Sequence, residues 1–287
     1  MSLLSALALE HCHNPNCRYR TARTRLSPSR GIVLNGEWFC GAPCFEAGVA
    51  LRCGSLMVDA VPPRPARAHR VPLGLLLISR GHIDLPTLRQ ALERQEVSGG
   101  RIGDVLRSMG KVTEQQITSA VASQWSCPVF ALRDHPNVAQ HAHMLPLGLL
   151  ERYRALPVYF SAATRVLHVA FAQEVSSTLL YAAQQMLTCS TEVCMADESA
   201  IMAALERARQ TPDRSEFLLA RMGTSSEMGR IAVGYAQKLA ATGARLLSCD
   251  DYLWMRLTRK DKSSDFLFQL SAAAMTGQQY QEAAEIG

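Results

Sequence analysis

Four of the nine cysteines in this chain are spaced like the ligands of a metal ion. They form two short-range pairs that are 22 residues apart, Cys12-x4-Cys17 and Cys40-x3-Cys44. Two such pairs can supply the four thiolates of a tetrahedral structural zinc site. A catalytic metal would need an open coordination position and a neighbouring general base, and the sequence identifies neither. We therefore predict one structural zinc site at the two pairs.

The sequence around the second pair, GEWFCGAPC, resembles the second knuckle of TRASH/MYM-type zinc ribbons, in which an aromatic residue precedes Cys-x3-Cys. The first pair departs from that pattern, with four intervening residues instead of two, so the fourth ligand could be Cys12, His11 or His13. The resemblance implies a small N-terminal zinc ribbon that contacts protein or nucleic acid. The remaining cysteines are expected to be buried or incidental thiols, because the chain shows no export signal that would favour disulfides: Cys53, Cys127, Cys189, Cys194 and Cys249.

The composition is that of a multi-unit globular protein. The chain has 287 residues, of which 48% are hydrophobic, enough to build two or three compact units. No apolar run reaches the roughly 20 residues that span a bilayer. The segment from Met1 to Leu9 is apolar but lacks the basic start of a signal peptide. We therefore expect a cytoplasmic protein without a membrane span.

The positive charge of the chain is concentrated near its N-terminus. The net charge is +5, and residues 1–70 hold nine Lys/Arg against four Asp/Glu. Such a basic segment can contact a nucleic acid or an acidic partner, and the alternative is a solvated loop. Its central residues lie between the two cysteine pairs: Arg18, Arg20, Arg23, Arg25 and Arg30.

An internal repeat occupies the next region. Residues 72–95 align without gaps with residues 101–124, at an offset of 29 residues. Each copy reads as a short helix, a glycine stop and a second helix, with Gly81 and Gly110 placed to end the first helix. Asp84 and Thr113 are suitable N-caps for the second helix. The sequence therefore predicts two helical hairpins that pack with pseudo-symmetry.

Composition shifts divide the rest of the chain. The segment VPPRPARAHR before the repeat is rich in Pro and Arg, and RARQTPDRSE after residue 206 is polar with a proline. Between them, strand and helix patterns alternate. The fold class we expect is α/β (α+β), divided as follows: 1–60 zinc ribbon, 61–70 linker, 71–125 repeated helical hairpins, 126–207 small α/β half, and 208–287 an α+β tail.

The repeat resembles the paired motif RLGxxLxxxGxxxxxxLxxxLxxQ of the MshEN domain, the N-terminal module of type II secretion and type IV pilus assembly ATPases. The five-residue gap between the copies also matches, and the resemblance extends over about residues 70–207. In that family the paired motifs bind cyclic di-GMP. The resemblance therefore implies these ligand contacts: Arg70, Leu73, Gly74, Leu77, Gly81, Gln95, Arg101, Ile102, Gly103, Asp104, Leu106, Gly110 and Gln124.

The first copy departs from the family pattern at its opening residue. Pro72 stands where the motif has Arg, whereas Arg101 matches at the start of the second copy. Arg101 would pair with a guanine edge or stack on its plane, and Asp104 would accept from guanine N–H groups. Arg70 could reach the ligand from two residues upstream of Pro72. The glycines after these positions, Gly74 and Gly103, would let the backbone approach the ligand.

The function that the resemblance implies is a cyclic di-GMP receptor that signals to a protein partner. The alternative is a degenerate docking module that binds secretion or pilus machinery, or another protein, without nucleotide; Pro72 favours this interpretation. A zinc-ribbon nucleic-acid binder rests on the basic segment alone. No GxxxxGK[ST] phosphate loop and no set of nucleophile and base is visible. We therefore expect no enzymatic activity.

Overall fold

The computed structural model describes residues 9–18, 22–24, 31–58, 70–134, 138–210, 216–260 and 262–270. The chain forms two compact units. One comprises Met1–Pro63 together with Arg214–Gly287, and the other comprises Arg64–Asp213. The expected linker at 61–70 lies outside the described residues except for Arg70.

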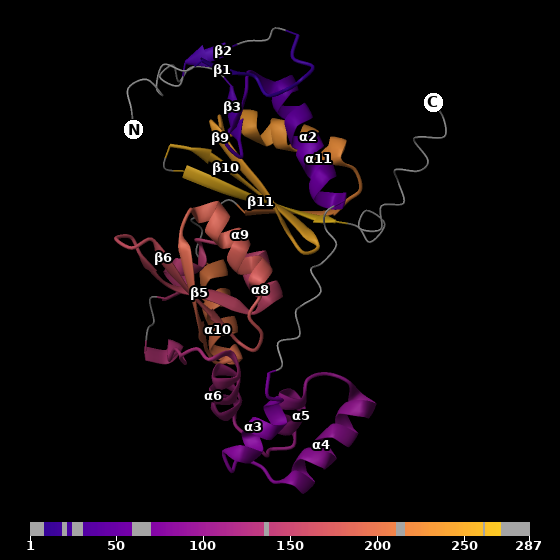
Figure 1. Cartoon of the computed structure of the whole chain (residues 1–287), viewed down its shortest axis with the longest axis vertical. Helices are drawn as coiled ribbons and strands as arrows, with labels where there is room; N and C mark the ends of the chain where they lie inside the picture. The colour runs from indigo at the N-terminus through magenta and orange to yellow at the C-terminus, as the bar shows by residue number, and fades with distance from the viewer. Residues whose placement is uncertain are drawn as a thin grey trace. The chain divides into compact units, whose positions relative to one another are not determined.

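The second unit begins with four helices, two in each copy of the repeat (Figure 1). They are α3 (Leu73–Ser79), α4 (Leu85–Ser98), α5 (Ile102–Ser108) and α6 (Glu114–Trp125). Gly81 and Gly110 have positive φ angles of 69° and 66°, which an L side chain rarely adopts. His82 N donates to Leu77 O, and Lys111 N donates to Leu106 O. Both short helices therefore end in the same glycine-dependent motif.

The long helices of the hairpins begin at the predicted caps. The Asp84 side chain accepts from Thr87 N at 2.9 Å. Thr113 and Gln116 form a reciprocal capping box, in which the Thr113 side chain accepts from Gln116 N and the Gln116 side chain accepts from Thr113 N. Leu77 and Leu106 are both fully buried in the core between the helices. The helical repeat is thus a packed unit with equivalent ends in its two copies.

The α/β half of this unit follows the repeat. Its three-stranded sheet has the order β5-β6-β7, with β5 and β6 antiparallel and β6 and β7 parallel. Helix α9 makes the crossover between the two parallel strands. The elements are η1 (Leu132–Asp134), α7 (Ala139–Ala142), α8 (Leu147–Tyr153), β5 (Ala155–Ser161), β6 (Val166–Phe171), α9 (Ser177–Leu187), β7 (Ser190–Met195) and α10 (Glu198–Arg209).

One strand expected in this half is shorter than predicted. The sequence suggests a strand over residues 128–132, but the structure has only an isolated bridge between Val129 and Met195. Met195 N donates to Pro128 O and Phe130 N donates to Met195 O. Pro128 has no N–H to extend the ladder, and the chain turns into η1 at Leu132, so the pairing stops after one bridge.

The first unit is built from both ends of the chain. Its six-stranded sheet has the order β4-β3-β9-β10-β11-β8, so two N-terminal strands lie beside four C-terminal ones. The pairing of Val33 with Gly243 joins the two parts. The elements are β1 (Leu9–His11), β2 (Ala22–Thr24), β3 (Ile32–Leu34), β4 (Glu37–Phe39), α2 (Ala42–Val58), β8 (Glu216–Met222), α11 (Ser225–Lys238), β9 (Gly243–Cys249), β10 (Tyr252–Arg259) and β11 (Lys262–Leu270).

Helices α2 and α11 pack against each other, as Figure 1 shows. A Cβ placed on Gly229 of α11 would lie 2.9 Å from the Glu46 carbonyl oxygen of α2, so the helices approach closely. Their buried side chains share one core with Leu246, Met255 and Phe266 of the sheet. The alternate residues of β10 and β11 point to the opposite face of the sheet, and four of these are also buried: Trp254, Arg256, Asp265 and Leu267.

This arrangement differs from the division expected from the sequence, in which residues 1–60 and 208–287 are separate. Asn35 shows how the two parts are joined. Its side chain donates to Leu246 O at 2.9 Å and accepts from Leu246 N at 2.8 Å, extending the sheet pairing beyond β3. Among the described residues, no helix is long and apolar enough to cross a membrane.

Candidate ligand and metal sites

Gly74 and Gly103 allow the two helices of each hairpin to approach each other closely. A Cβ on Gly74 would lie 2.6 Å from Leu88 Cδ1, and one on Gly103 would lie 3.4 Å from Ile117 Cγ2. Leu88 and Ile117 are equivalent positions of the repeat, so the two hairpins close in the same way. Gly103 would also meet Leu73 Cδ2 at 3.3 Å, which places the start of the first copy against the start of the second. Close helix packing thus accounts for a small residue at both positions.

The glutamines that end the two copies make equivalent hydrogen bonds. Gln95 donates to the carbonyl of Gly100 at 2.8 Å, and Gln124 donates to the carbonyl of Val71 at 2.8 Å. Val71 and Gly100 each precede the opening residue of a copy. Each glutamine therefore fixes the backbone just before a short helix, and the Gln124 bond brings together the end of one copy and the start of the other.

The two arginines expected near this end have different partners. Arg101 is exposed and donates through Nη1 to the side-chain oxygen of Gln173, in the loop that follows β6. Arg70 is exposed too, and its guanidinium lies 3.1 Å from the centroid of the Trp125 ring. Asp104 forms an exposed ion pair with Arg107 at 3.6 Å. Both arginines are thus at the surface, and each guanidinium contacts another side chain: that of Arg70 lies against Trp125, and that of Arg101 bonds to Gln173.

The other expected contacts fall into two groups. Leu73 and Ile102 are half-buried at the helix starts, whereas Leu77 and Leu106 have no exposed surface and belong to the core. Gly81 and Gly110 lie in the turns at the far ends of the short helices. The helix starts, the two glutamines and Arg101 therefore form the candidate ligand site, and these two leucines and two turn glycines have structural positions.

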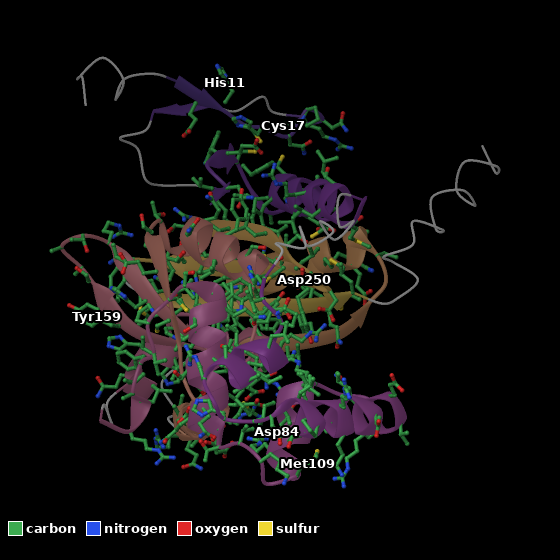
Figure 2. The ribbon with its side chains drawn as sticks, turned by 60° about the horizontal axis from the view of Figure 1, so that its bottom comes forward. His11, Cys17, Asp84, Met109, Tyr159 and Asp250 are labelled. Carbon is green, nitrogen blue, oxygen red and sulfur yellow. The ribbon has the colours of Figure 1, made fainter. Side chains whose placement is uncertain are left out.

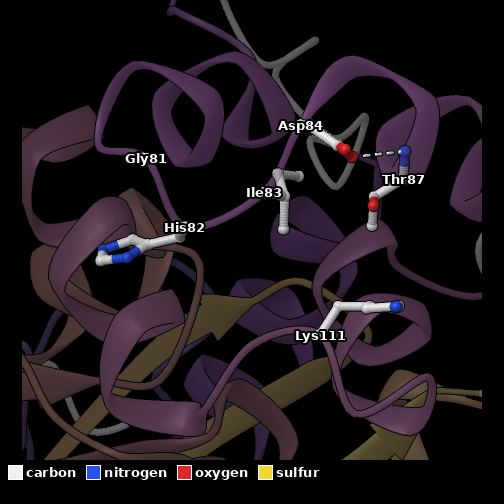
Figure 3. A pocket seen from close by; sticks show the side chains of 6 residues that line it. All are labelled: Gly81, His82, Ile83, Asp84, Thr87 and Lys111. Atoms are coloured by element: carbon white, nitrogen blue, oxygen red, sulfur yellow. Dashed lines mark hydrogen bonds between the residues drawn. The ribbon is translucent and has the colours of Figure 1, made fainter.

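A pocket of about 350 Å³ lies at those turns (Figure 3). It is lined by Gly81, His82, Ile83, Asp84, Thr87 and Lys111. Hydrogen bonds from Thr87 hold the pKa of Asp84 below its usual range, so this carboxylate is charged near neutral pH. It would repel an anion that entered beside Lys111. The sequence did not indicate this pocket, and its mixed charge does not favour a phosphate ligand.

The four N-terminal cysteines form a compact sulfur cluster. Their Sγ atoms all lie within 4.8 Å of one another, and Cys40 Sγ lies 3.7 Å from both Cys17 Sγ and Cys44 Sγ. These distances exceed the roughly 2.05 Å of a disulfide. They agree with the edge of a tetrahedron of sulfur atoms around zinc, about 3.8 Å for Zn–S bonds of about 2.3 Å. Neither His11 nor His13 belongs to this group among the described residues.

Local structure brings the sulfur atoms together. Cys17 N donates to Asn14 O, which closes a turn between the first two cysteines, and Cys44 lies in the first turn of α2 (Figure 2 labels Cys17). Cys40 N donates to Cys12 Sγ at 3.5 Å. Burial, together with the neighbouring thiols, raises the pKa of Cys44 to about 12. A metal ion would displace the protons of such thiols, since the thiolate is the ligand.

Most of the basic segment lies outside the described residues. Arg20, Arg25 and Arg30 lie outside the described residues, as does the side chain of Arg23. Arg18 is described and exposed. Contact with a nucleic acid therefore stays a prediction from the sequence.

Comparison with known proteins finds a family model that matches the α/β half. Residues 125–215 match the family model of the MshEN domain. The type IV pilus assembly ATPase PilB of Myxococcus xanthus is 30% identical over 86 residues, which is 30% of this chain and 15% of that protein. The type IV pilus assembly ATPase PilB of Thermus thermophilus is 24% identical over 135 residues, 47% of this chain and 15% of that protein.

Two solved structures are similar as well. The structure of MshE with cdg is 30% identical, covering 48% of this chain and 99% of that one, with a TM-score of 0.39. The N-terminal domain of XpsE is 20% identical, covering 47% of this chain and 92% of that one, with a TM-score of 0.36. The chain spans about 15% of the length of the curated relatives it matches. Residues 125–215, the α/β half that follows the helical repeat, are therefore identified as matching the MshEN domain.

Proposed function

We propose that this chain is a receptor for cyclic di-GMP and that it passes the signal to a protein partner. The observation that carries the proposal is the equivalence of the two helix starts, each fixed by a glutamine through the carbonyl of Val71 or Gly100. Cyclic di-GMP consists of two identical halves, so a site with two equivalent halves suits it. The MshEN match next to the repeat supports this ligand class.

Arg101 is the residue that we expect to contribute most to binding. Arg101→Ala should weaken cyclic di-GMP binding roughly 5- to 150-fold, since a guanidinium on a guanine edge or phosphate typically contributes about 1–3 kcal/mol. Arg70→Ala should weaken it less, because Arg70 is engaged with the Trp125 ring. Calorimetry with cyclic di-GMP, and with GTP as control ligand, measures both. Equal binding by Arg101→Ala and wild type would remove Arg101 from the site.

The alternative function is a docking module that binds secretion or pilus machinery, or another protein, without nucleotide. Two observations favour it. Packing against Leu88 and Ile117 accounts for Gly74 and Gly103 without any ligand. Pro72 also offers no side-chain donor where Arg101 stands in the second copy. If folded protein fails to bind cyclic di-GMP at high micromolar ligand, this alternative replaces the receptor.

We propose further that Cys12, Cys17, Cys40 and Cys44 hold a structural zinc ion. The spacing of their sulfur atoms supports a closed site of four thiolates, which leaves no coordination position for a substrate. When bound, the metal would supply rigidity rather than chemistry. The ribbon beside it is a candidate surface for the protein partner.

We expect no ATP hydrolysis by this chain. The sequence holds no phosphate loop, and the similarity covers 15% of each pilus ATPase. Without residues that grip the β- and γ-phosphates with Mg²⁺, phosphoryl transfer has no catalyst. A phosphate-release assay should match its buffer control. Turnover that follows the chain through purification and disappears in a point variant would contradict this expectation.

A further inference from the structure

Three consecutive residues at the start of α10 form hydrogen bonds with other elements. Asp197 accepts from Thr118 Oγ1 at 2.6 Å. Ser199 donates to Glu114 through its backbone N at 2.8 Å and through its hydroxyl at 2.6 Å. Between them, Glu198 accepts from Gln173 at 2.6 Å. These residues, Asp197 to Ser199, form the junction between the α/β half and the repeat.

Among the described residues, the hydrogen bonds from the repeat to this junction come from its second copy. They involve Glu114 and Thr118 directly, and Arg101 through Gln173. The positions 29 residues earlier hold different residue types, Pro72, Leu85 and Arg89. Leu85 is 48% exposed, so the equivalent face of the first copy is open. The two copies therefore differ in residue type at the three positions where the second copy bonds to the α/β half, directly or through Gln173.

The amide of Gln173 can adopt only one orientation in this network. Its oxygen accepts from Arg101, which only donates, and its nitrogen donates to Glu198, which only accepts when ionised. Glu198 is itself paired with Arg154. Gln173 is half-buried, and its hydrogen bond to Glu198 ties its side chain to the α/β half.

Gln173 occupies Nη1 of Arg101 and leaves the other edge of the guanidinium available. The Nε and Nη2 groups form the second edge, which can bind a guanine or a phosphate with two parallel hydrogen bonds. A neutral amide also leaves the positive charge of Arg101 uncancelled. We infer that Gln173 is a positioning residue that orients Arg101 for the ligand, so that the α/β half sets the affinity of the repeat. This inference rests on the proposed receptor function.

The test compares cyclic di-GMP binding by four variants of the full chain in calorimetry. Gln173→Ala should weaken binding roughly three- to tenfold, because a free arginine loses its side-chain freedom only when the ligand binds. Combined with Arg101→Ala, it should cause no further loss. Gln173→Glu keeps an acceptor but cancels the charge of Arg101, so it should weaken binding at least as much. Gln184→Ala is the control: it removes the hydrogen bond from another side-chain amide of the α/β half to Thr191. This variant should bind cyclic di-GMP like wild type.

The outcomes separate the two proposals. Thermal unfolding of each variant shows whether the fold is retained. If wild type binds and Gln173→Ala binds equally well, or if its effect simply adds to that of Arg101→Ala, Gln173 does not act through Arg101 and the inference fails while the receptor stands. If wild type does not bind, the receptor proposal fails and the inference fails with it.

Discussion

Removing zinc with a chelator should unfold the unit that contains the six-stranded sheet and leave the helical repeat folded. The four cysteines proposed as ligands lie in residues 12–44 of that unit, and the repeat belongs to the other unit. Structural zinc in small sites contributes about 10–16 kcal/mol of apparent binding energy, comparable with the roughly 5–15 kcal/mol stability of a whole domain. The unfolding should spread beyond the cysteine cluster, because β3 pairs with β9 and α2 packs on α11.

Metal analysis and hydrogen exchange measure this expectation. Protein prepared under reducing conditions should contain about one zinc per chain, as a closed four-thiolate site holds one ion. Cys44→Ser should lose the metal, whereas Cys53→Ala removes a buried thiol from the same helix and should retain it. After chelation, exchange should rise in β9 and α2 but not in α4 or α6. A zinc-free wild type with unchanged protection would show that the cluster needs no metal.

The helical repeat was predictable because its signals are local. Gly81, Gly110 and the capping box at Thr113 each act on residues within one turn, so the sequence contains all the partners. The spacing of the cysteines likewise predicted a cluster that the structure forms. The ligand contacts that the resemblance implies were harder to predict. In the structure the side chains of Gln95 and Gln124 bond to backbone carbonyls, and Leu77 lies in the core.

Long-range pairing accounts for what the sequence does not predict. The side chain of Asn35 meets Leu246 across 211 positions, and nothing local in either segment indicates that the N-terminal hairpin and the C-terminal strands share a sheet. Strand β8 begins at the end of an expected polar boundary, and its partner β11 begins 46 residues later, at Lys262. The sequence also did not predict the hydrogen bond from Arg101 to Gln173. It did show that the two copies begin differently, with Pro72 in the first and Arg101 in the second.

Asp265→Ala should destabilise the same unit by about 3–5 kcal/mol, the typical cost of leaving one partner of a buried ion pair alone. Asp265 is 1% exposed and accepts from Arg256 Nε at 2.6 Å and Nη2 at 2.9 Å. It also accepts from the Trp254 indole N–H at 2.9 Å. Without the carboxylate, Arg256, itself 6% exposed, would keep a buried charge without its bidentate partner. Urea unfolding of zinc-loaded protein, followed by circular dichroism, measures the loss.

A double variant separates the buried charge from the loss of packing. Arg256→Met with Asp265→Ala removes both charges, so it should be more stable than Asp265→Ala alone, although Trp254 still loses its acceptor. An exposed pair provides the contrast: Glu192→Ala, which removes a carboxylate 65% exposed beside His168, should cost less than about 1 kcal/mol. If Asp265→Ala were as mild as Glu192→Ala, or if the double variant were the less stable of the two, the bond between Asp265 and Arg256 would not be what stabilises this part of the sheet.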